Sequence, residues 1–305
     1  MPKAIRIHEW GGPEVLKVEV LPRPVPKFDE VLIRVHGASI NPLDWKIREG
    51  SRRAMYTLPY HLGCDVAGTV EETGASVTDF SRGDAVYSMI GREGGYAEYA
   101  VAKASAVAPK PITLNFAKAG AVPLAALTAW QMLNENGNLK AGQRVLVHAA
   151  AGGVGGFAVQ LAHHLGGYVI ATASARNHDY LRGIGAQEVI DYNTTKFETV
   201  VRDIDLVIDL VAGEVQARSW GVMKPGGMLV CALGPPDAAK AAAAGMQCKA
   251  QSVRPDGAQL REIGALIDAG TIKVELAASF PLEKVGEAHT LSETGHVRGK
   301  IVLTA

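Results

Sequence analysis

The first 115 or so residues alternate apolar and polar positions over short runs, which glycine and proline interrupt. Residues 31–35 (VLIRV) and 66–70 (VAGTV) are two clear examples. Alternation with a period of two between turn residues is typical of β-strands that bury one face. The region is therefore predicted to be an all-β unit, with a loop at residues 22–26 (PRPVP).

From about residue 120 the pattern changes to apolar runs of four to six residues, separated by stretches of helical periodicity. This order predicts a parallel sheet with helices on both faces. The clearest helix covers residues 155–165, and the apolar run at 117–133 is predicted to be a buried helix. Strands are predicted at Arg144–His148, Tyr168–Thr172, Glu188–Ile190, Leu206–Leu210, Met228–Ala232 and Gln251–Val253.

After about residue 258 the elements are mixed. A helix carries apolar residues at 260, 263, 266 and 267, and it is followed by a strand near 272–276, a helix over 285–291 and a last strand at 300–303. This tail does not extend the parallel sheet, so it is predicted to return to the first unit. The expected domains are 1–120 completed by 259–305, and 121–258.

Composition narrows the classes of partner. The 305 residues are 48% hydrophobic, and 31 basic residues balance 31 acidic ones, so no net field draws the chain to nucleic acid or to an anionic membrane. No secretory signal or bilayer-spanning segment is visible in the sequence. The three cysteines are far apart. These features predict a cytoplasmic protein that binds a small molecule.

The strongest local signal is the segment 145–156 (VLVHAAAGGVGG), an apolar strand that runs into a glycine turn and an apolar helix. Gly152 lets the backbone approach a pyrophosphate, Gly155 allows tight packing of the helix, and the helix N-terminus supplies free N–H groups. Such a turn also occurs as a plain strand-to-helix connection, but its flanks favour cofactor binding. The predicted contacts are Ala150, at the first glycine position, and Gly152, Gly153, Val154 and Gly155.

The choice of cofactor depends on the end of the second strand, where an acidic side chain would bind the ribose hydroxyls of NADH. Residues 173–178 (ASARNH) offer no carboxylate there. Ser174 and Arg176 can instead bind a 2′-phosphate, which predicts NADPH. The alternative is that Ser174 caps the next helix and Arg176 is a solvated charge. Tyr192, after the third strand, is a further candidate contact.

Four motifs span the chain: residues 41–46 (NPLDWK), 63–71 (GCDVAGTVE), the glycine turn, and 295–303 (GHVRGKIVL). With them the whole chain resembles the medium-chain dehydrogenase/reductase superfamily, within it the zinc-free, NADPH-dependent quinone oxidoreductase branch. The resemblance implies an α/β fold, with a Rossmann-type doubly wound parallel sheet and a GroES-like β-barrel catalytic domain completed by the tail. It also implies an active site in the cleft between the domains and a homodimer.

The sequence departs from the zinc alcohol dehydrogenases of that superfamily. By the resemblance, the positions of their three catalytic metal ligands hold Asn41, Cys64 and Leu124, and residues 88–104 contain none of the cysteines of a structural zinc lobe. No metal site is therefore expected. Without a Lewis acid, alcohol oxidation is disfavoured, whereas reduction of a quinone or of a carbonyl-conjugated double bond stays feasible. Cys64 is expected to be a buried apolar residue rather than a reactive thiol.

The loop after the third barrel strand carries the candidate donors for the acceptor oxygen, Asn41 and Lys46. Lys46 is also a candidate proton donor, with a surface charge or a ribose contact as the alternative. Asp44 is expected to order the loop or to bind a ribose hydroxyl rather than to act as a base. The turns with Val211, Leu233 and Gly234 are expected to meet the nicotinamide, because ligands bind at the carboxyl ends of strands. Arg298 and Lys300 are candidates to reach either the cofactor phosphates or the cleft.

The expected function is therefore zinc-independent transfer of a hydride from NADPH to a quinone or an α,β-unsaturated carbonyl compound. Two alternatives stay open. One is reduction of 2-enoyl thioesters, and the other is a non-catalytic NADPH-binding sensor or structural protein.

Overall fold

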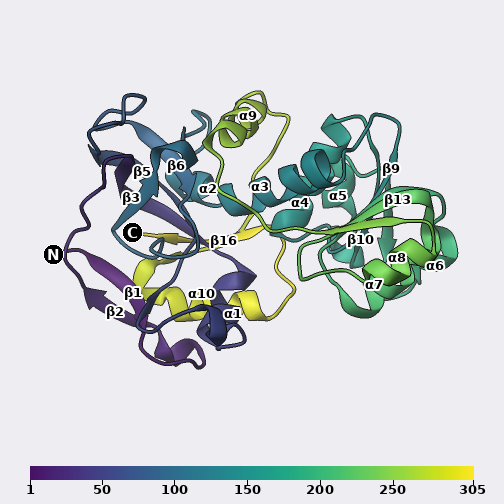
Figure 1. Cartoon of the computed structure of the whole chain (residues 1–305), viewed down its shortest axis with the longest axis horizontal. Coiled ribbons are helices and arrows are strands. Elements are labelled where there is room, and N and C mark those ends of the chain that lie inside the picture. The colour runs from purple at the N-terminus through teal and green to yellow at the C-terminus, as the bar shows by residue number, and fades with distance from the viewer. The chain divides into compact units, whose positions relative to one another are not determined.

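The computed structural model describes residues 1–305, and the chain folds into two compact units (Figure 1). Unit 1 consists of Met1–Leu124, Arg254–Gly270 and Val274–Ala305. Unit 2 consists of Ala125–Val253 and Thr271–Lys273. The chain thus leaves unit 1 twice, first for Ala125–Val253 and then for the short segment Thr271–Lys273.

Unit 1 is built on two sheets. The larger has the order β15-β16-β3-β5-β6-β8, with β7 also paired to β3, and the smaller has the order β2-β1-β4. The strands are β1 Lys3–Ile7, β2 Lys17–Val20, β3 Glu30–Ile40, β4 Tyr60–His61, β5 Asp65–Thr73, β6 Ala85–Met89, β7 Tyr99–Lys103, β8 Val107–Pro109, β15 Leu276–Pro281 and β16 Lys300–Thr304.

The long strands β3 and β5 form the centre of unit 1. Both are buried over most of their length, as expected of β-branched runs covered on both faces. Their close approach requires glycine at one position, because a Cβ atom on Gly68 would lie 1.9 Å from the carbonyl oxygen of Arg34. The core around them includes Ile5, Ile33 and Leu303, so the first and last strands of the chain share it.

Helices cover the ends of the unit 1 sheets. The helix α1 lies beside α10 (Figure 1). The buried guanidinium of Arg48, on α1, contacts the ring nitrogen Nδ1 of His289 at 3.2 Å and the carboxylate of Glu293 at 2.7 Å, both on α10. Burial lowers the pKa of His289 to about 3, so the ring is neutral and accepts this bond. The helical segments are η1 Pro13–Val15, α1 Pro42–Arg48, η2 Arg53–Met55, η3 Ala104–Ala106, α2 Phe116–Gly120, α9 Gly257–Asp268, η7 Leu282–Lys284 and α10 Val285–Glu293.

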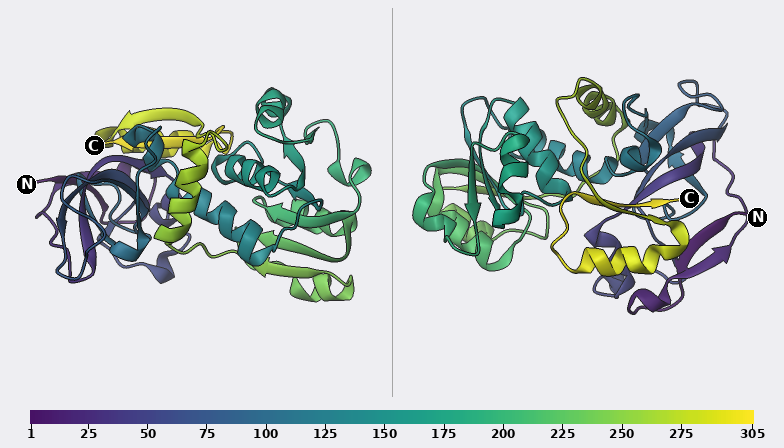
Figure 2. Two further views of the ribbon diagram at one scale, coloured as in Figure 1. Left: turned by 90° about the horizontal axis from the view of Figure 1, so that it is seen from above. Right: turned by 180° about the vertical axis from the view of Figure 1, so that it is seen from behind.

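Unit 2 contains one parallel sheet of six strands in the order β11-β10-β9-β12-β13-β14. The chain starts in the middle with β9, winds outward to β11, and then winds outward in the other direction to β14. Helices lie on both faces of the sheet (Figure 2). This is the doubly wound order of dinucleotide-binding folds. The strands are β9 Arg144–Val147, β10 Tyr168–Ala173, β11 Glu188–Asp191, β12 Ile204–Asp209, β13 Met223–Cys231 and β14 Gln247–Ala250.

The helical segments of unit 2 are α3 Pro123–Gln131, which begins in unit 1, η4 Met132–Asn136, α4 Gly153–His164, η5 Ala175–Asn177, α5 His178–Gly183, α6 Phe197–Val200, α7 Gly213–Ser219, η6 Trp220–Val222 and α8 Ala238–Ala243. The single helix predicted over residues 117–133 is wrong. The structure has α2 and α3 with a break between them, because Pro123 has no N–H to continue a helix and instead begins a new one.

The tail returns to unit 1 as predicted, since β16 pairs antiparallel with β3 in a register that places Val302 opposite Ser39. The strand predicted at 272–276 is wrong, because β15 begins only at Leu276. Lys273 instead belongs to unit 2, where its backbone N–H and C=O bond to the side-chain amide of Gln160 at 2.7 and 3.1 Å. At Lys273 the side chain of Gln160 therefore takes the place of a neighbouring strand as the hydrogen-bond partner of the backbone.

The strand predicted at 251–253 is also misplaced. The structure has β14 four residues earlier at its start, at Gln247, and the side chain of Gln251 accepts a hydrogen bond from Asn136 at 2.5 Å. A short edge strand gives a weak local pattern, so the sequence predicts the strand at the more apolar residues that follow it.

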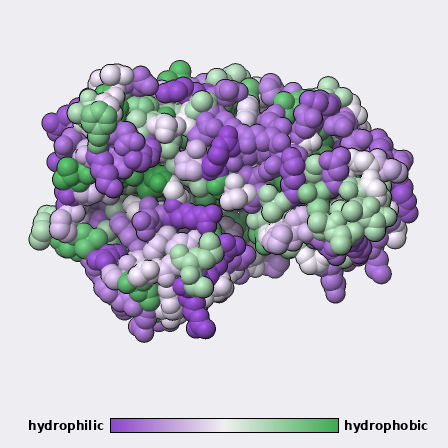
Figure 3. All heavy atoms as spheres, viewed as in Figure 1, coloured by the Kyte–Doolittle hydropathy of each residue, from purple (hydrophilic) through white to green (hydrophobic).

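Over the face in Figure 3 apolar and polar residues are intermixed. No helix of the structure has the length and apolar character of a bilayer span.

Candidate active site

The glycine turn of unit 2 joins β9 to α4 and leaves no room for a side chain at Gly155. A Cβ atom on Gly155 would lie 2.4 Å from the carbonyl oxygen of Ala149 and 2.7 Å from the Cα atom of Ala150. Ala149 itself has a φ of 49°, an uncommon value for a residue with a Cβ atom. The turn therefore brings the first turn of α4 directly against the end of the strand.

The N-terminus of α4 is free of any side-chain cap. Its N-cap residue is Gly152, and the half-exposed residues Gly153 and Val154 follow. The first N–H groups of a helix have no partner within the helix, and the helix dipole adds positive potential at the same place. With twelve residues, α4 is long enough to supply this potential. The turn fits the pyrophosphate of a dinucleotide, because the first N–H groups of α4 are not capped by any side chain.

The end of β10 carries the two predicted phosphate contacts. Ser174 follows the strand directly, and its hydroxyl accepts a hydrogen bond from Asn177 at 3.3 Å without capping the short helix η5. Arg176 is exposed. A carboxylate that the sequence reasoning missed, Asp191, pairs in register with Ala173, but it accepts hydrogen bonds at 3.0 and 2.9 Å from the backbone and side chain of Asn193.

Three large apolar side chains are exposed where the neighbouring strands end. Tyr192 is 52% exposed after β11, Val211 is 43% exposed after β12, and Leu233 is 42% exposed after β13. The buried carboxylate of Asp209 fixes the second of these turns by accepting hydrogen bonds from the backbone N–H groups of Val211 and Ala212. Gly234, with a φ of 146°, leaves open space beside the third turn. The carboxyl edge of the unit 2 sheet therefore combines an uncapped helix N-terminus with exposed apolar side chains.

Unit 1 holds a buried polar cluster around Asn41, which we call the Asn41 cluster: Ser39, Asn41, Asp65, Leu124 and Lys300. The Asn41 side chain donates from Nδ2 to the Asp65 carboxylate at 2.8 Å and accepts at Oδ1 from the Lys300 ammonium at 2.5 Å. Asp65 also accepts from the Ser39 hydroxyl and the Leu124 backbone N–H, both at 2.7 Å. Burial lowers the pKa of Lys300, and the carboxylate of Asp65 offsets part of that shift.

The residues after β3 form a helix, α1, and the prediction of a loop there is wrong. Pro42 sits in the first turn, where its missing N–H costs nothing, and the Asp44 carboxylate accepts the backbone N–H of Asn41 at 2.7 Å. Asp44 also accepts the hydroxyl of Tyr96 at 2.8 Å. Burial raises the pKa of Asp44 to about 6. Its position is thus that of a buried residue that orders the helix start.

Lys46 is half-buried on α1, and its ammonium lies 5.4 Å from the centre of the Trp45 ring. The contact is a cation–π interaction. The indole N–H of Trp45 is buried without a hydrogen-bond partner. The ammonium of Lys46 and the unpaired indole N–H of Trp45 are therefore carried by neighbouring residues of α1, five and four positions after Asn41.

The positions that correspond to zinc ligands are engaged with protein groups. The thiol of Cys64 is buried, its contact to the Asp44 carboxylate is 3.6 Å, and burial raises its pKa well above the usual value. Asn41 bonds to Asp65 and Lys300, and the backbone N–H of Leu124 donates to Asp65. The structure contains no group of three or more His, Cys, Asp or Glu side chains arranged to hold a metal ion.

The two cations of the closing motif differ in their surroundings. Arg298 forms an ion pair with Glu275 at 3.0 Å and is half-exposed. Lys300 is 5% exposed, and its ammonium donates to the carbonyl of Ile40 at 2.9 Å as well as to Asn41. The structure therefore joins Lys300 to Asn41 and Arg298 to Glu275.

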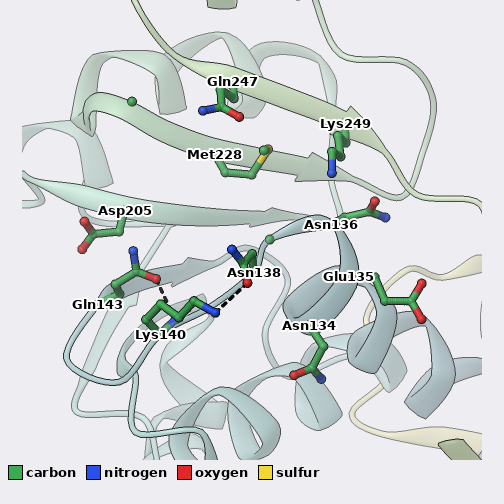
Figure 4. A pocket seen from close by; sticks show the side chains of 12 residues that line it. Asn134, Glu135, Asn136, Asn138, Lys140, Gln143, Asp205, Met228, Gln247 and Lys249 are labelled. Atoms are coloured by element: carbon green, nitrogen blue, oxygen red, sulfur yellow. Dashed lines mark hydrogen bonds between the residues drawn. The ribbon is translucent and has the colours of Figure 1, made fainter.

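A polar pocket of about 450 Å³ lies elsewhere in unit 2 (Figure 4). Its lining includes Gln143 before β9, Asp205 on β12 and Gln247 on β14, which are all near the amino ends of these strands. Two further residues of the lining, Asn138 and Lys140, bond to each other at 2.7 Å. The pocket is thus on the opposite edge of the sheet from the glycine turn.

Comparison with known proteins places these features in a family. The alcohol dehydrogenase GroES-like domain matches residues 27–112, and the zinc-binding dehydrogenase family matches residues 184–303. The quinone oxidoreductase of Homo sapiens is 31% identical over 319 residues, which cover 99% of this chain and 97% of the relative. The chloroplastic quinone-oxidoreductase homolog of Spinacia oleracea is 33% identical over 312 residues, with 96% and 95% covered.

Solved structures of quinone oxidoreductases are also similar to this chain. The quinone oxidoreductase of Coxiella burnetii superposes with a TM-score of 0.93 at 36% identity and covers 100% of this chain and 99% of its own. The Escherichia coli quinone oxidoreductase, solved in complex with NADPH, gives a TM-score of 0.91 at 27% identity, with 99% and 100% covered. Together with the doubly wound sheet and the glycine turn, these similarities show that the chain belongs to the quinone oxidoreductases of the medium-chain dehydrogenase/reductase superfamily.

Proposed function

We propose that this chain is a zinc-independent, NADPH-dependent oxidoreductase that reduces a quinone or an α,β-unsaturated carbonyl compound. The observation that carries the proposal is the carboxyl edge of the unit 2 sheet. A backbone-lined helix N-terminus, a serine and an arginine after β10, and three exposed apolar side chains all lie at that edge. Two relatives of this fold, from Escherichia coli and from mycobacteria, were solved with NADPH.

We assign the cofactor contacts to residues at this edge of the unit 2 sheet. The backbone of Ala150 and of residues 152–155 holds the pyrophosphate, while Ser174 and Arg176 bind the 2′-phosphate. Tyr192 packs beside the adenosine, and the turns at Val211, Leu233 and Gly234 contact the nicotinamide end. When bound, NADPH supplies the hydride. Arg298, half-exposed beside Glu275, is assigned a contact with the cofactor phosphates.

The residues of unit 1 stabilise the charge that develops on the acceptor. Asn41 donates a hydrogen bond to the carbonyl oxygen as it gains negative charge, and an amide donor in a buried site suits this role because little water competes. Lys46, held over the indole of Trp45, supplies the proton that completes reduction of an enone. Asp44 keeps both residues in place by closing the first turn of α1.

Zinc independence is supported by what surrounds the three corresponding positions. An ammonium group, Lys300, contacts Asn41, and a dication beside it would be repelled. Cys64 is the only thiol among the three positions, since the other two are an amide and an apolar side chain, whereas a zinc site is built from thiolate, imidazole or carboxylate ligands. Because the family matched at residues 184–303 is described as zinc-binding, metal content needs direct measurement.

Two further features belong to the proposal. A homodimer would form through β14, which is the last strand of the unit 2 sheet and so has an unpaired edge. A cytoplasmic location is predicted from the low number of cysteines, and all three are free thiols in the structure. Light scattering of the purified protein tests the first, and localisation in cells tests the second.

The decisive experiment follows NADPH oxidation by the purified protein with a panel of quinones, enones and 2-enoyl thioesters. Turnover of quinones or enones, with less than one equivalent of metal per ten chains and no loss after chelation, is the expected result. Turnover of thioesters alone would replace the proposal with thioester reduction. Tight NADPH binding without turnover on any acceptor would indicate a sensor, and stoichiometric zinc in active protein would refute zinc independence.

A further inference from the structure

We propose that Lys300 and Asp65 are positioning residues that hold the side-chain amide of Asn41 in one orientation and so fix the direction of its remaining N–H. The inference rests on the proposed function in one respect only, namely that this N–H serves the carbonyl oxygen of the acceptor. The fixed orientation itself is a property of unit 1 and can be tested without any substrate.

The two ends of the amide meet groups of opposite charge. Lys300 can only donate, and its ammonium lies 2.5 Å from Asn41 Oδ1. The Asp65 carboxylate accepts from three protein donors, and one of these bonds joins its Oδ2 atom to Asn41 Nδ2 at 2.8 Å. Turning the amide by 180° would place oxygen against carboxylate and N–H against ammonium, so both bonds would be lost at once. The charged partners therefore permit a single orientation.

Both partners are themselves fixed. Asp65 begins β5 and accepts two further hydrogen bonds, from the Ser39 hydroxyl and the Leu124 backbone, so it can neither rotate nor move toward solvent. Lys300 begins β16, and its ammonium also donates to the backbone carbonyl of Ile40. That carbonyl belongs to the residue that pairs with Ile301 across the sheet. The sheet register thus sets the position of the ammonium.

One N–H of Asn41 Nδ2 has no protein partner, since the structure shows a single bond from that atom. Asn41 is 2% exposed, so water competes little for the free N–H. The ammonium on Oδ1 withdraws electron density through the conjugated amide, which makes the remaining N–H a stronger donor. Lys300 therefore places its positive charge where it acts on the acceptor through Asn41, without touching the substrate.

Lys300→Met tests the inference, because methionine fills a similar volume and removes the ammonium. The first measurement is the pair of side-chain NH₂ signals of Asn41 in protein labelled with ¹⁵N-asparagine, assigned by their loss in Asn41→Ala. We expect two well-separated proton shifts in the wild type and a converged or exchange-broadened pair in Lys300→Met. An unchanged pair would overturn the inference, whatever the activity.

The second measurement is a double-mutant cycle on turnover with a quinone. Asn41→Ala is expected to lower kcat about 100-fold, in the range for loss of one oxyanion donor, and Lys300→Met about tenfold. If Lys300 acts through Asn41, the double variant has the kcat of Asn41→Ala within about a factor of two. Multiplying effects, or a weakened NADPH affinity with unchanged kcat, would show that Lys300 acts elsewhere.

Controls separate folding from function. Lys284→Met removes an exposed lysine of unit 1 that pairs only with Glu287, and it is expected to leave both measurements unchanged. Lys300→Met leaves buried carboxylates without their cation, so this single variant can fail to fold. In that case the double variant Lys300→Met/Asp65→Asn replaces it in both measurements. The double variant is neutral at both sites, and it is expected to show the same released amide. Failure of the wild type to reduce any acceptor would refute the proposed function, while the NMR signals would still decide the orientation.

Discussion

The carboxylate of Asp44 accepts the backbone N–H of Asn41 at 2.7 Å, so the residue that orders α1 is bonded directly to the residue that we assign to the acceptor. Asp44 makes this bond at no measurable exposure to solvent. The stability of the first turn of α1 therefore depends on whether the buried Asp44 carboxyl is ionised. Because the pKa of Asp44 is about 6, this dependence can be measured as a change of stability with pH.

Asp44→Asn is expected to stabilise the protein more at pH 8 than at pH 5. The pKa of Asp44 is about 6 in the folded protein and 3.8 ordinarily, so the folded state holds the proton longer, and this residue's contribution to stability falls as pH rises through that interval. The gain of the variant over the wild type should grow by about 1 kcal/mol between pH 5 and pH 8. Denaturant unfolding at the two pH values measures it.

Asp29→Asn is the matched control. Asp29 is exposed, and its hydrogen bond to Lys103 lowers its pKa, so the same substitution there should give no growing gain at higher pH. A difference between wild type and Asp44→Asn that is constant with pH would contradict the raised pKa.

Gly155→Ala is expected to destabilise unit 2 and to weaken binding of NADPH. The new Cβ atom would lie 2.4 Å from a backbone oxygen, so the start of α4 must move, at a cost of about 1–3 kcal/mol. Gly183→Ala adds a methyl group with no atom within 4 Å and should not destabilise the protein. Thermal unfolding and nucleotide titration of both variants make the comparison. Equal behaviour of the two would argue against tight packing at the turn.

Arg176→Ala is expected to weaken NADPH binding by about 10- to 100-fold and to leave NADH binding unchanged. The reason is that a charge-assisted hydrogen bond to the 2′-phosphate exists only for NADPH. Arg182→Ala removes a nearby arginine of α5 that pairs with Asp179 at 3.5 Å, and it should affect neither nucleotide. Fluorescence titration gives the four dissociation constants. An equal loss for NADPH and NADH would remove Arg176 from the specificity site.

Lys46→Met is expected to lower kcat for an enone about 100-fold and to lower kcat for a quinone less. Reduction of the enone needs a proton donor, whereas a quinone can take its protons from water after the hydride has arrived. The dissociation constant of NADPH should stay the same, which steady-state kinetics and titration together establish. Unchanged turnover of the enone at saturating concentration would exclude Lys46 from the mechanism.

Local patterns in the sequence were sufficient for the outline of the fold. The glycine turn at 152–155, the strand before it and the helix after it follow from neighbouring residues, and the structure has β9 and α4 there. The return of the tail followed from its mixed order of elements. The edge strand at 247–250 is not predicted, because its pairing partner β13 lies outside its own window. The helix at 42–48 is not predicted either, although its start signals are local: Pro42 lies in the first turn, and Asp44 accepts the backbone N–H of Asn41.

The surroundings of Asn41 needed the tertiary structure. Asn41 was singled out from its motif, but its partners Asp65 and Lys300 are 24 and 259 positions away in the chain. The only sequence signal for Asp65 is that it is a charged residue within the apolar run 62–70. For Lys300 the sequence leaves open the cofactor phosphates and the cleft, and it does not indicate Asn41 as the partner. The sequence alone determined which polar side chains the chain carries into its strands. The folded sheet, through the register of β16 on β3, decided which of them meet, because a buried donor finds its acceptor only where the packing brings the two together.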